Sequence, residues 1–548
     1  MSMKKIYGIY LAYPPTIDLR DQGLGRHLAA FLNGAIESKG AHFIIVCPSW
    51  SKKSILALMK AESVPESSFQ IIAPAKPIIS LQLFDWYQQI ISRLKPKKEK
   101  TKKVTFLDRF KKTNFYFRKK ILTATNILQF LLLGVPVLIS FLVISIFSAV
   151  DKIVRFLNES FFKQGYIKKS WFFKRIIRPI LGIIRSPKDS FTVTGWFKVI
   201  EQQETDLMLK LIEGMTEVRA WYSPTAFWPS FNQISRPHLM CVPDVVLTEF
   251  PIGFANVGGN RFLDTFKTIE HAIEGGTHFV TYSDHVKKTI LVKRYKRKEK
   301  HVRVIPHAAN TLHQIIEQQA MSSKEIENAY QQHFSNALTK SSLQENGGTA
   351  ANADLKFIFY ASQFRPSKNV ITLLRAYQYL LRERFVTHKL ILTGKPKVME
   401  EIDQFIIDNQ LGHEVLLLSG LSVAELAACY KLADLAVNPS LSEGGCPFTF
   451  TEALSVGTPV VMADIPVTTE IINDPGLQQQ MLFDPYSWKS LADRIEWALT
   501  NRDKLLKQQV HFFDKLAQRT WKDVVNDYIN ELDRISESVN VEASGQVI

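Results

Sequence analysis

The sequence predicts an α/β protein with two Rossmann-like domains, each built around a parallel sheet. Strand-like and helix-like stretches alternate along residues 5–90 and 196–306, and a second alternating series runs from 356 to 483. Alternation of this kind is typical of parallel sheets whose crossover connections are helices. A chain of 548 residues is also long enough for several domains with separate cores.

The first series defines the N-terminal half. It opens with a strand candidate at Lys5–Tyr13, and Leu24–Ser38 has the apolar spacing of a helix. Two lysines precede the apolar run of this segment, but the run is short and reaches Pro14-Pro15, so we interpret it as a strand and not as a signal peptide. Further elements are expected at Phe43–Pro48, Trp196–Tyr222, His238–Thr248, Phe279–Ser283 and Val302–Pro306. Residues 1–312 are therefore predicted to form one domain, with an insertion at 91–190.

The second series defines the C-terminal half. Strands are expected at Lys356–Ala361, Lys389–Thr393, Val415–Leu418, Asp434–Asn438, Pro459–Ala463 and Met481–Phe483, with helical patterns between them such as Val370–Arg384 and Val398–Asn409. This spacing predicts a doubly wound domain over 354–515. The preceding residues 313–353 are polar and are expected to be a linker, and residues 516–548 to be a C-terminal helix with a frayed tail.

The basic charge of the chain is concentrated in the insertion. The whole chain has a net charge of +16, whereas residues 91–190 contain 23 Lys and Arg against 5 Asp and Glu. Residues 121–150 carry no charge, and Ile127–Val150 is long enough to span hydrocarbon about 30 Å thick. Both flanks are basic, however, and a single span would separate residues 1–90 from the rest of their sheet.

We therefore expect residues 91–190 to bind an anionic membrane surface on its cytoplasmic face. A re-entrant or hairpin segment, bent near Gly134-Val135-Pro136, would have basic amphipathic helices on either side. Each Lys or Arg near such a surface contributes roughly 1 kcal/mol. A buried core helix with a solvated basic linker is the alternative. The long uncharged run argues against nucleic-acid binding, so no nucleic-acid partner is expected.

The cysteines indicate a reducing compartment. Cys47, Cys241, Cys429 and Cys446 have neither metal-ligand spacing nor the pattern of a small disulfide-bonded domain. The sequence also lacks an Asp-x-Asp motif, a Walker A loop, an HExxH motif and a nucleophile elbow. No metal or other cofactor is expected.

The most informative motif lies between two acidic residues in the C-terminal half. The strand before Pro439 leads into a glycine-containing turn with Glu443, and a short helix with Glu452 ends at Gly457-Thr458-Pro459. A loop of free backbone N–H groups that leads into a helix N-terminus is an anion site, and flanking carboxylates can bind hydroxyl groups. The motif predicts a nucleotide-sugar pocket. An ordinary crossover with two surface acids is the alternative.

This segment resembles the donor-site signature of family 4 of the retaining glycosyltransferases, which have the GT-B fold of two Rossmann-like domains facing across a cleft. That family places seven residues between the acids, whereas this chain has eight between Glu443 and Glu452. The resemblance implies that Glu452 takes the ribose hydroxyls and that Glu443 helps to hold the sugar. It also implies donor contacts from Gly444, Gly445, Cys446, Pro447 and Phe448.

Two cations follow the first strand of the C-terminal half. Arg365 and Lys368 stand in the loop Ser362–Asn369, just before a helix. Ligands of open α/β sheets bind at the carboxyl ends of strands, and a guanidinium with an ammonium suits a diphosphate. The loop resembles the QFRP-x-K loop of dolichol-linked oligosaccharide mannosyltransferases, which implies that both side chains hold the diphosphate. The alternative is a solvated basic loop.

Three N-terminal motifs are similar to positions of the same family. Gly25 stands in a GxGRH sequence that opens a helix, where the resemblance implies close approach of the donor phosphates; a plain tight turn is the alternative. Asp244 follows Pro243, where family members often carry His-Asp. Asp244 either orients the acceptor or sugar, or is a turn residue. His307 replaces the asparagine of a VIPNG-like strand, and we interpret it as architectural.

Together these resemblances imply a retaining, metal-independent glycosyltransferase. Its donor would be a nucleoside diphosphate sugar, and its acceptor a lipid-linked or membrane-proximal glycan. Arg365, Lys368, Asp244 and Glu443 are the candidate catalytic residues. Because the histidine of the His-Asp pair is missing, a non-catalytic scaffold or regulatory subunit at the membrane is the alternative.

Overall fold

The computed structural model describes most of the chain outside the insertion. The described residues are 5–15, 17, 19, 23–38, 40–75, 193–312, 322–340 and 355–545, with single positions at 127, 135 and 316. The predicted membrane-binding insertion at 91–190 lies outside these residues, apart from Ile127 and Val135. Among the described helices, none combines the length and hydropathy that a membrane span needs.

The N-terminal half contains a parallel sheet of seven strands in the order β3-β2-β1-β4-β5-β6-β7. The strands are β1 (Lys5–Tyr10), β2 (Ala41–Val46), β3 (Phe69–Ile72), β4 (Val218–Ser223), β5 (His238–Cys241), β6 (His278–Thr281) and β7 (Val302–Val304). The order reverses between β1 and β4, and an open sheet has its binding crevice at the carboxyl edge of such a point.

Helices connect these strands. The α-helices are α1 (Gly23–Glu37), α2 (Ser51–Ala61), α8 (Val193–Gly214), α9 (Val246–Glu249), α10 (Pro251–Gly258) and α11 (Asn260–Gly275). A π-helix, η5 (Val286–Arg294), and the short 3₁₀ helices η2 (Glu66–Ser68), η4 (Pro229–Gln233) and η6 (Glu299–His301) are the other helices in the described part of this half.

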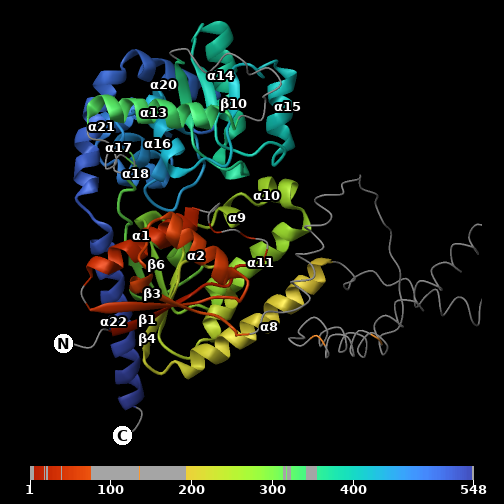
Figure 1. Ribbon diagram of the computed structural model, residues 1–548, viewed down its shortest axis with the longest axis vertical. Helices are drawn as coiled ribbons and strands as arrows, with labels where there is room; N and C mark the ends of the chain where they lie inside the picture. Colours follow the sequence, from red (N-terminus) through yellow and green to blue (C-terminus); the bar gives the residue numbers. More distant parts are fainter. Residues whose placement is uncertain are drawn as a thin grey trace, which may run out of the picture.

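The C-terminal half contains a second parallel sheet, in the order β10-β9-β8-β11-β12-β13. Its strands are β8 (Phe357–Tyr360), β9 (Lys389–Leu392), β10 (Val415–Leu417), β11 (Leu435–Asn438), β12 (Val460–Ala463) and β13 (Leu482–Phe483). The reversal here lies between β8 and β11. The two sheets therefore form the two Rossmann-like domains that the sequence predicts, stacked one above the other in Figure 1.

The helices of this domain surround a second hydrophobic core. They are α13 (Ser323–Leu338), η9 (Pro366–Lys368), α14 (Val370–Glu383), α15 (Glu400–Asp408), α16 (Val423–Leu432), α17 (Phe448–Ser455), α18 (Pro466–Ile471), α19 (Pro475–Met481), α20 (Trp488–Thr500) and α21 (Arg502–Ala517).

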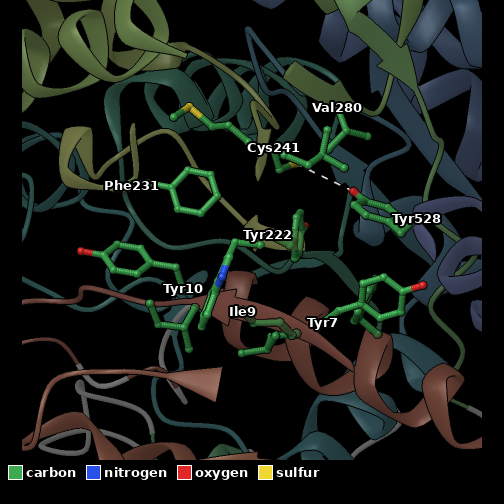
Figure 2. Close-up of a cluster of buried hydrophobic side chains, with 14 of the residues drawn as sticks. Tyr7, Ile9, Tyr10, Tyr222, Phe231, Cys241, Val280 and Tyr528 are labelled. Atoms are coloured by element: carbon green, nitrogen blue, oxygen red, sulfur yellow. Dashed lines mark hydrogen bonds between the residues drawn. The ribbon is translucent and has the colours of Figure 1, made fainter. Parts of the chain in front are cut away.

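The last helix returns to the N-terminal domain. Helix α22 (Trp521–Gly545) begins beside the C-terminal domain and runs along the other one (Figure 1). Its residues Val524, Val525, Tyr528, Leu532 and Ile535 belong to the N-terminal core. Figure 2 shows Tyr528 beside Tyr222 and Cys241, and the two tyrosine rings are 5.0 Å apart. The chain therefore crosses between the domains twice, which restrains how they separate.

The structure differs from the sequence prediction between residues 313 and 353. A polar linker is predicted there, but residues 323–338 form α13, which packs against α16. Tyr330, Phe334 and Ala337 are buried in the C-terminal core, so this segment is part of the domain. The rest of the predicted linker, except Ile316, lies outside the described residues.

Candidate active site

A cavity of about 830 Å³ lies between the two domains. Its walls are the loops that follow β1, β5, β6 and β7 on one side and β8, β9, β10 and β11 on the other. These are carboxyl ends of parallel strands, where open α/β sheets bind ligands. Ten of the eleven predicted site residues line it: Asp244, Arg365, Lys368, Glu443, Gly444, Gly445, Cys446, Pro447, Phe448 and Glu452.

Lys368 and Glu443 form an ion pair inside the cavity, with Nζ and Oε1 2.7 Å apart. Burial lowers the pKa of Lys368, but the nearby Glu443 and the Tyr360 hydroxyl outweigh it, so that its pKa is raised overall. Lys368 is therefore a permanent cation. Arg365 lies in the same loop and donates from Nη2 to the Gln363 side-chain oxygen at 2.8 Å. Arg365 and Lys368, the candidate residues for diphosphate binding, therefore line the same cavity as Glu443, the first acid of the motif.

The loop after β11 leads directly into helix α17. Phe448 and Thr449, in its first turn, line the cavity, and Pro447 is the residue before the helix. The first N–H groups of a helix have no partner within it and carry partial positive charge. With Lys368 and Arg365, this helix end provides hydrogen-bond donors on one wall of the cavity that suit a phosphate.

Glu452 has partners that the sequence did not reveal. Its side chain is only 2% exposed. Oε1 accepts hydrogen bonds from Arg26 Nη1 at 2.9 Å and from Asn310 Nδ2 at 2.6 Å. Glu452 raises the pKa of Arg26 by its charge, against the opposing effect of burial. Arg26 belongs to α1, so the second acid of the motif is held from the opposite domain.

The glycines of the motif lie where the two domains touch. A Cβ atom on Gly444 would be 1.7 Å from the Pro243 carbonyl oxygen, and one on Gly445 would be 2.7 Å from Tyr282 Cβ. Pro243 and Tyr282 belong to the N-terminal domain. Real Cβ atoms do not approach so closely, so these glycines allow the loop after β11 to meet the opposite domain.

Gly25 lies next to residues that line the cavity but is not itself among them. These neighbours are Gly23, Arg26 and His27. A Cβ atom on Gly25 would lie 2.1 Å from the Leu19 carbonyl oxygen. The requirement for glycine therefore comes at least from packing against Leu19, and the approach of donor phosphates to this turn stays a prediction.

Asp244 lies at the cavity wall beside the two charged groups. Its side chain is exposed to the cavity. Its pKa is raised, mainly because the cavity walls reduce its solvation and also because the Glu443 carboxylate is close, whereas the charge of Lys368 acts in the opposite direction. Oδ1 also accepts a long hydrogen bond of 3.5 Å from the Val246 backbone. The location of Asp244 therefore fits both interpretations given above. It starts the turn into α9, and it also faces the cavity.

Two histidines line the cavity in addition to the predicted residues. The rings of His27 and His307 are 6.2 Å apart, and His307 packs edge-on against Phe448 at 4.8 Å. Burial, with a smaller effect of His307, lowers the pKa of His27 to about 3, so His27 is neutral. The architectural interpretation of His307 did not predict that it lines the cavity. The signal for this was present in the sequence, because His307 stands just after the carboxyl end of β7.

Within the described residues, no group of three or more His, Cys, Asp or Glu side chains could hold a metal ion. The cations that line the cavity are Arg26, Arg365, Lys368 and Lys395, and the N-terminus of α17 adds partial positive charge. Of these, Arg26 is already paired with Glu452. These groups can neutralise a diphosphate, and Glu443 and Glu452 can accept from hydroxyl groups. The arrangement is chemically suited to a nucleoside diphosphate that carries a sugar.

Comparisons with known proteins agree with this geometry. Residues 341–511 match the family described as "Glycosyl transferases group 1". The O-antigen chain mannosyltransferase RfbU of Salmonella typhimurium is 33% identical over 108 residues, which cover 20% of this chain and 30% of that protein. O-antigen chain mannosyltransferase B of Escherichia coli is 30% identical over 176 residues, 32% of this chain and 45% of that one. The chain thus spans less than half of the length of these curated relatives.

Two solved structures share the fold over nearly the whole chain. A glycosyltransferase from Rickettsia africae has a TM-score of 0.50 at 10% identity and covers 97% of this chain and 98% of its own. The N-terminal domain of Candida albicans trehalose-6-phosphate phosphatase has a TM-score of 0.54 at 13% identity, with 98% of both chains covered. With the two sheet orders, these likenesses show the GT-B α/β fold.

Proposed function

We propose that this protein is a retaining glycosyltransferase that moves a sugar from a nucleoside diphosphate sugar to a lipid-linked or membrane-proximal glycan, as in the assembly of lipopolysaccharide, polysaccharide or glycolipid. The observation that carries the proposal is the convergence of Arg365, Lys368 and the α17 N-terminus on one wall of an interdomain cavity that also contains Glu443 and Glu452. Its relatives include O-antigen chain mannosyltransferases, which supports a glycan acceptor of this class.

In this proposal Arg365 and Lys368 hold the diphosphate. Oε1 of Glu452 already accepts from Arg26 and Asn310, so Oε2 is the atom that accepts from a ribose hydroxyl. Lys368 keeps Glu443 in place through their ion pair, and Glu443 with the backbone of Gly444–Phe448 holds the sugar. The ribose, the diphosphate and the sugar are thus held by α17, by the loop after β8 and by the loop after β11, respectively.

The transfer step needs no protein base in this proposal. The bond between the anomeric carbon and the diphosphate oxygen breaks, and the acceptor oxygen bonds to the same face of that carbon. The departing phosphate takes the acceptor proton. Arg365, Lys368 and the helix end stabilise the negative charge that develops on the phosphate. A missing histidine at Pro243 is compatible with this route, and no metal ion is required.

Variants that lack the proposed phosphate or ribose contact test the proposal. Donor hydrolysis or sugar transfer should fall steeply in Arg365→Ala and in Glu452→Ala. Wild-type rates in both variants would contradict the assignment.

A non-catalytic, nucleotide-binding scaffold at the membrane is the second candidate. Two sequence features favour it: Pro243 stands where the family pattern has a histidine, and eight residues separate Glu443 from Glu452 where the family has seven. Nucleotide-sugar binding by purified wild-type protein without hydrolysis or transfer would support the scaffold.

We also propose that residues 91–190 attach the protein to the cytoplasmic face of an anionic membrane. The support is their composition, with 23 Lys and Arg and the uncharged stretch 121–150. Deletion of 95–188 should reduce flotation with vesicles, and unchanged flotation would remove this part of the proposal.

A further inference from the structure

His307 lies beside the loop that is proposed to hold the sugar, although it comes from the other domain. It stands three residues after β7, lines the cavity and is half-buried. A Cβ atom on Gly445 would lie 3.3 Å from His307 Nε2 and 3.4 Å from its Cδ2. The edge of the imidazole that carries Nε2 therefore faces the loop after β11.

Backbone contacts on both sides hold His307 in place. Before it, the Ile305 N–H donates to the carbonyl of Thr281, the last residue of β6, at 2.8 Å. After it, the Asn310 N–H donates to Thr451 Oγ1 of α17 at 3.1 Å. The segment is thus fixed to one domain at its start and to the other at its end, which gives the ring a defined position at the cavity.

Neighbouring rings fix the orientation of the imidazole. The His307 ring packs edge-on against Tyr282, with centroids 5.3 Å apart, and against Phe448 at 4.8 Å. Edge-to-face arrangements at such distances are favourable. Tyr282 follows β6 of the N-terminal domain, whereas Phe448 opens α17 of the C-terminal domain. The imidazole is therefore held between side chains of both domains.

The imidazole is neutral and has its hydrogen on Nδ1. Burial lowers the pKa of His307, against the effect of backbone hydrogen bonds to Ala308 and Cys446, so the ring is uncharged near pH 7. Nδ1 lies 2.9 Å from the Ala308 carbonyl oxygen. Because a carbonyl oxygen can only accept, Nδ1 carries the hydrogen, and Nε2 has a lone pair that can accept from a hydroxyl group.

His307 presents a polar side-chain atom to this turn of the loop, and its neighbours do not. Near Gly445, the closest atoms of the opposite domain are Tyr282 Cβ and the His307 ring. Near the preceding glycine, they belong to the backbone of Pro243 and Asp244. The Tyr282 hydroxyl oxygen is buried, so it does not reach the cavity. Nε2 is therefore the side-chain atom of this group that lies closest to a sugar held by the loop.

We propose that His307 Nε2 accepts a hydrogen bond from a hydroxyl group of the transferred sugar. This inference rests on the proposed function, in which Glu443 and the loop after β11 hold the sugar. His307 is then a specificity-determining residue, because it adds a contact from the N-terminal domain to those of the C-terminal domain. The contact is made to the sugar, so it strengthens binding of a nucleoside diphosphate sugar but not of the nucleoside diphosphate alone.

Comparing these two ligands separates the contact of His307 from all others in the pocket. Isothermal titration calorimetry of the full-length protein gives the Kd of UDP-, GDP- and ADP-sugars and of UDP, GDP and ADP. In His307→Asn the side-chain amide can still donate to the Ala308 carbonyl, but Nε2 is lost. The Kd of the sugar donor that the wild-type protein binds should rise about fivefold, which is typical of one lost hydrogen bond between neutral groups. The Kd of its nucleoside diphosphate should stay within about twofold.

The matched control is His413→Asn, at an exposed histidine of the C-terminal domain, which should bind both ligands as the wild-type protein does. An unchanged Kd of the sugar donor in His307→Asn would overturn the inference. An equal rise for both ligands would also overturn it, since His307 would then act only by holding the loop. If the wild-type protein bound no nucleotide sugar, the proposed function itself would fail. Donor binding that responds to His307→Asn, without any sugar transfer, would support this contact and contradict the proposed transfer.

Discussion

Arg26 and Glu452 form an ion pair across the interdomain cavity, with Nη1 and Oε1 2.9 Å apart. One comes from the first helix of the N-terminal domain and the other from the helix of the predicted donor motif. The pair ties the ribose-binding candidate to the opposite domain, so the pocket is complete only when both domains contribute.

Breaking this pair should weaken the association of the domains. In Arg26→Met the Glu452 carboxylate stays buried and retains only Asn310 as a partner. Because Arg26 is 28% exposed, we expect a loss of about 2 kcal/mol rather than the full cost of an isolated buried charge. Denaturant unfolding of Arg26→Met, Glu452→Gln and the double variant measures the coupling between them.

The control is Arg384→Met, which breaks an exposed pair with Glu496 inside the C-terminal domain and should leave the unfolding midpoint unchanged. Additive losses in the double variant would show that Arg26 and Glu452 do not stabilise each other.

Gly444→Ala should prevent the close contact of the domains. Its new methyl group would overlap the Pro243 carbonyl, so the donor loop must move away from the N-terminal domain. We expect a larger radius of gyration in small-angle scattering and reduced donor binding. Gly412→Ala, at a glycine with no atom near its Cβ position, is the control; scattering curves that coincide for both variants would refute this role.

Gly25→Ala should destabilise the N-terminal domain. The added methyl group would lie 2.1 Å from the Leu19 carbonyl, and overpacking of this kind costs about 1–3 kcal/mol. Gly23→Ala is the matched variant, because Gly23 lies in the same helix and its Cβ position is open. If thermal unfolding shows equal midpoints for the two variants, the packing explanation of Gly25 is wrong.

His27 should make the stability depend on pH. Its folded-state pKa is about 3, whereas the unfolded chain takes up the proton near pH 6.5. The stability that neutral His27 contributes is therefore complete above about pH 6.5 and is lost progressively as the pH falls toward 3. In His27→Phe, the loss of unfolding free energy between pH 7 and pH 5 should be smaller by roughly 2 kcal/mol. Parallel pH profiles for variant and wild type would contradict this.

Chelation should not abolish transfer. Because Arg365, Lys368 and the α17 N-terminus supply the positive charge in the proposed mechanism, EDTA should change the rate by less than about twofold. A rate that falls to background with EDTA and returns with Mg²⁺ or Mn²⁺ would show that a metal ion takes part.

The sequence predicted much of the two sheets. The strands β8 to β13 all fall within predicted segments, because buried parallel strands are continuous apolar runs such as Phe357–Tyr360. The edge strand β3 was missed, since its four residues include the exposed Gln70 and two half-buried isoleucines. Helix α13 was missed because its exposed face is polar. Its N-terminal signal was present, as Ser322 accepts a hydrogen bond from the Glu325 backbone.

The sequence predicted the site residues of the C-terminal domain more completely than those that the N-terminal domain contributes. Arg365, Lys368 and Glu443 belong to loops of one domain, so the order of strands is enough to bring them together. The partners of Glu452 and the position of His307 depend on how the domains face each other, which no local pattern specifies. The contact of Gly25 with the Leu19 carbonyl was not predicted, because a glycine in a turn does not reveal which atom lies next to its Cα atom.

Binding of nucleotide sugars tests the central claim most directly. In a thermal-shift screen with UDP-, GDP- and ADP-sugars, at least one donor should stabilise the wild-type protein, by about 2.7 kcal/mol at 100 times its dissociation constant. The same donor should lose most of this effect with Lys368→Ala and Arg365→Ala. If no nucleotide sugar stabilises the wild-type protein, or if both variants respond as it does, the cavity is not a nucleotide-sugar site.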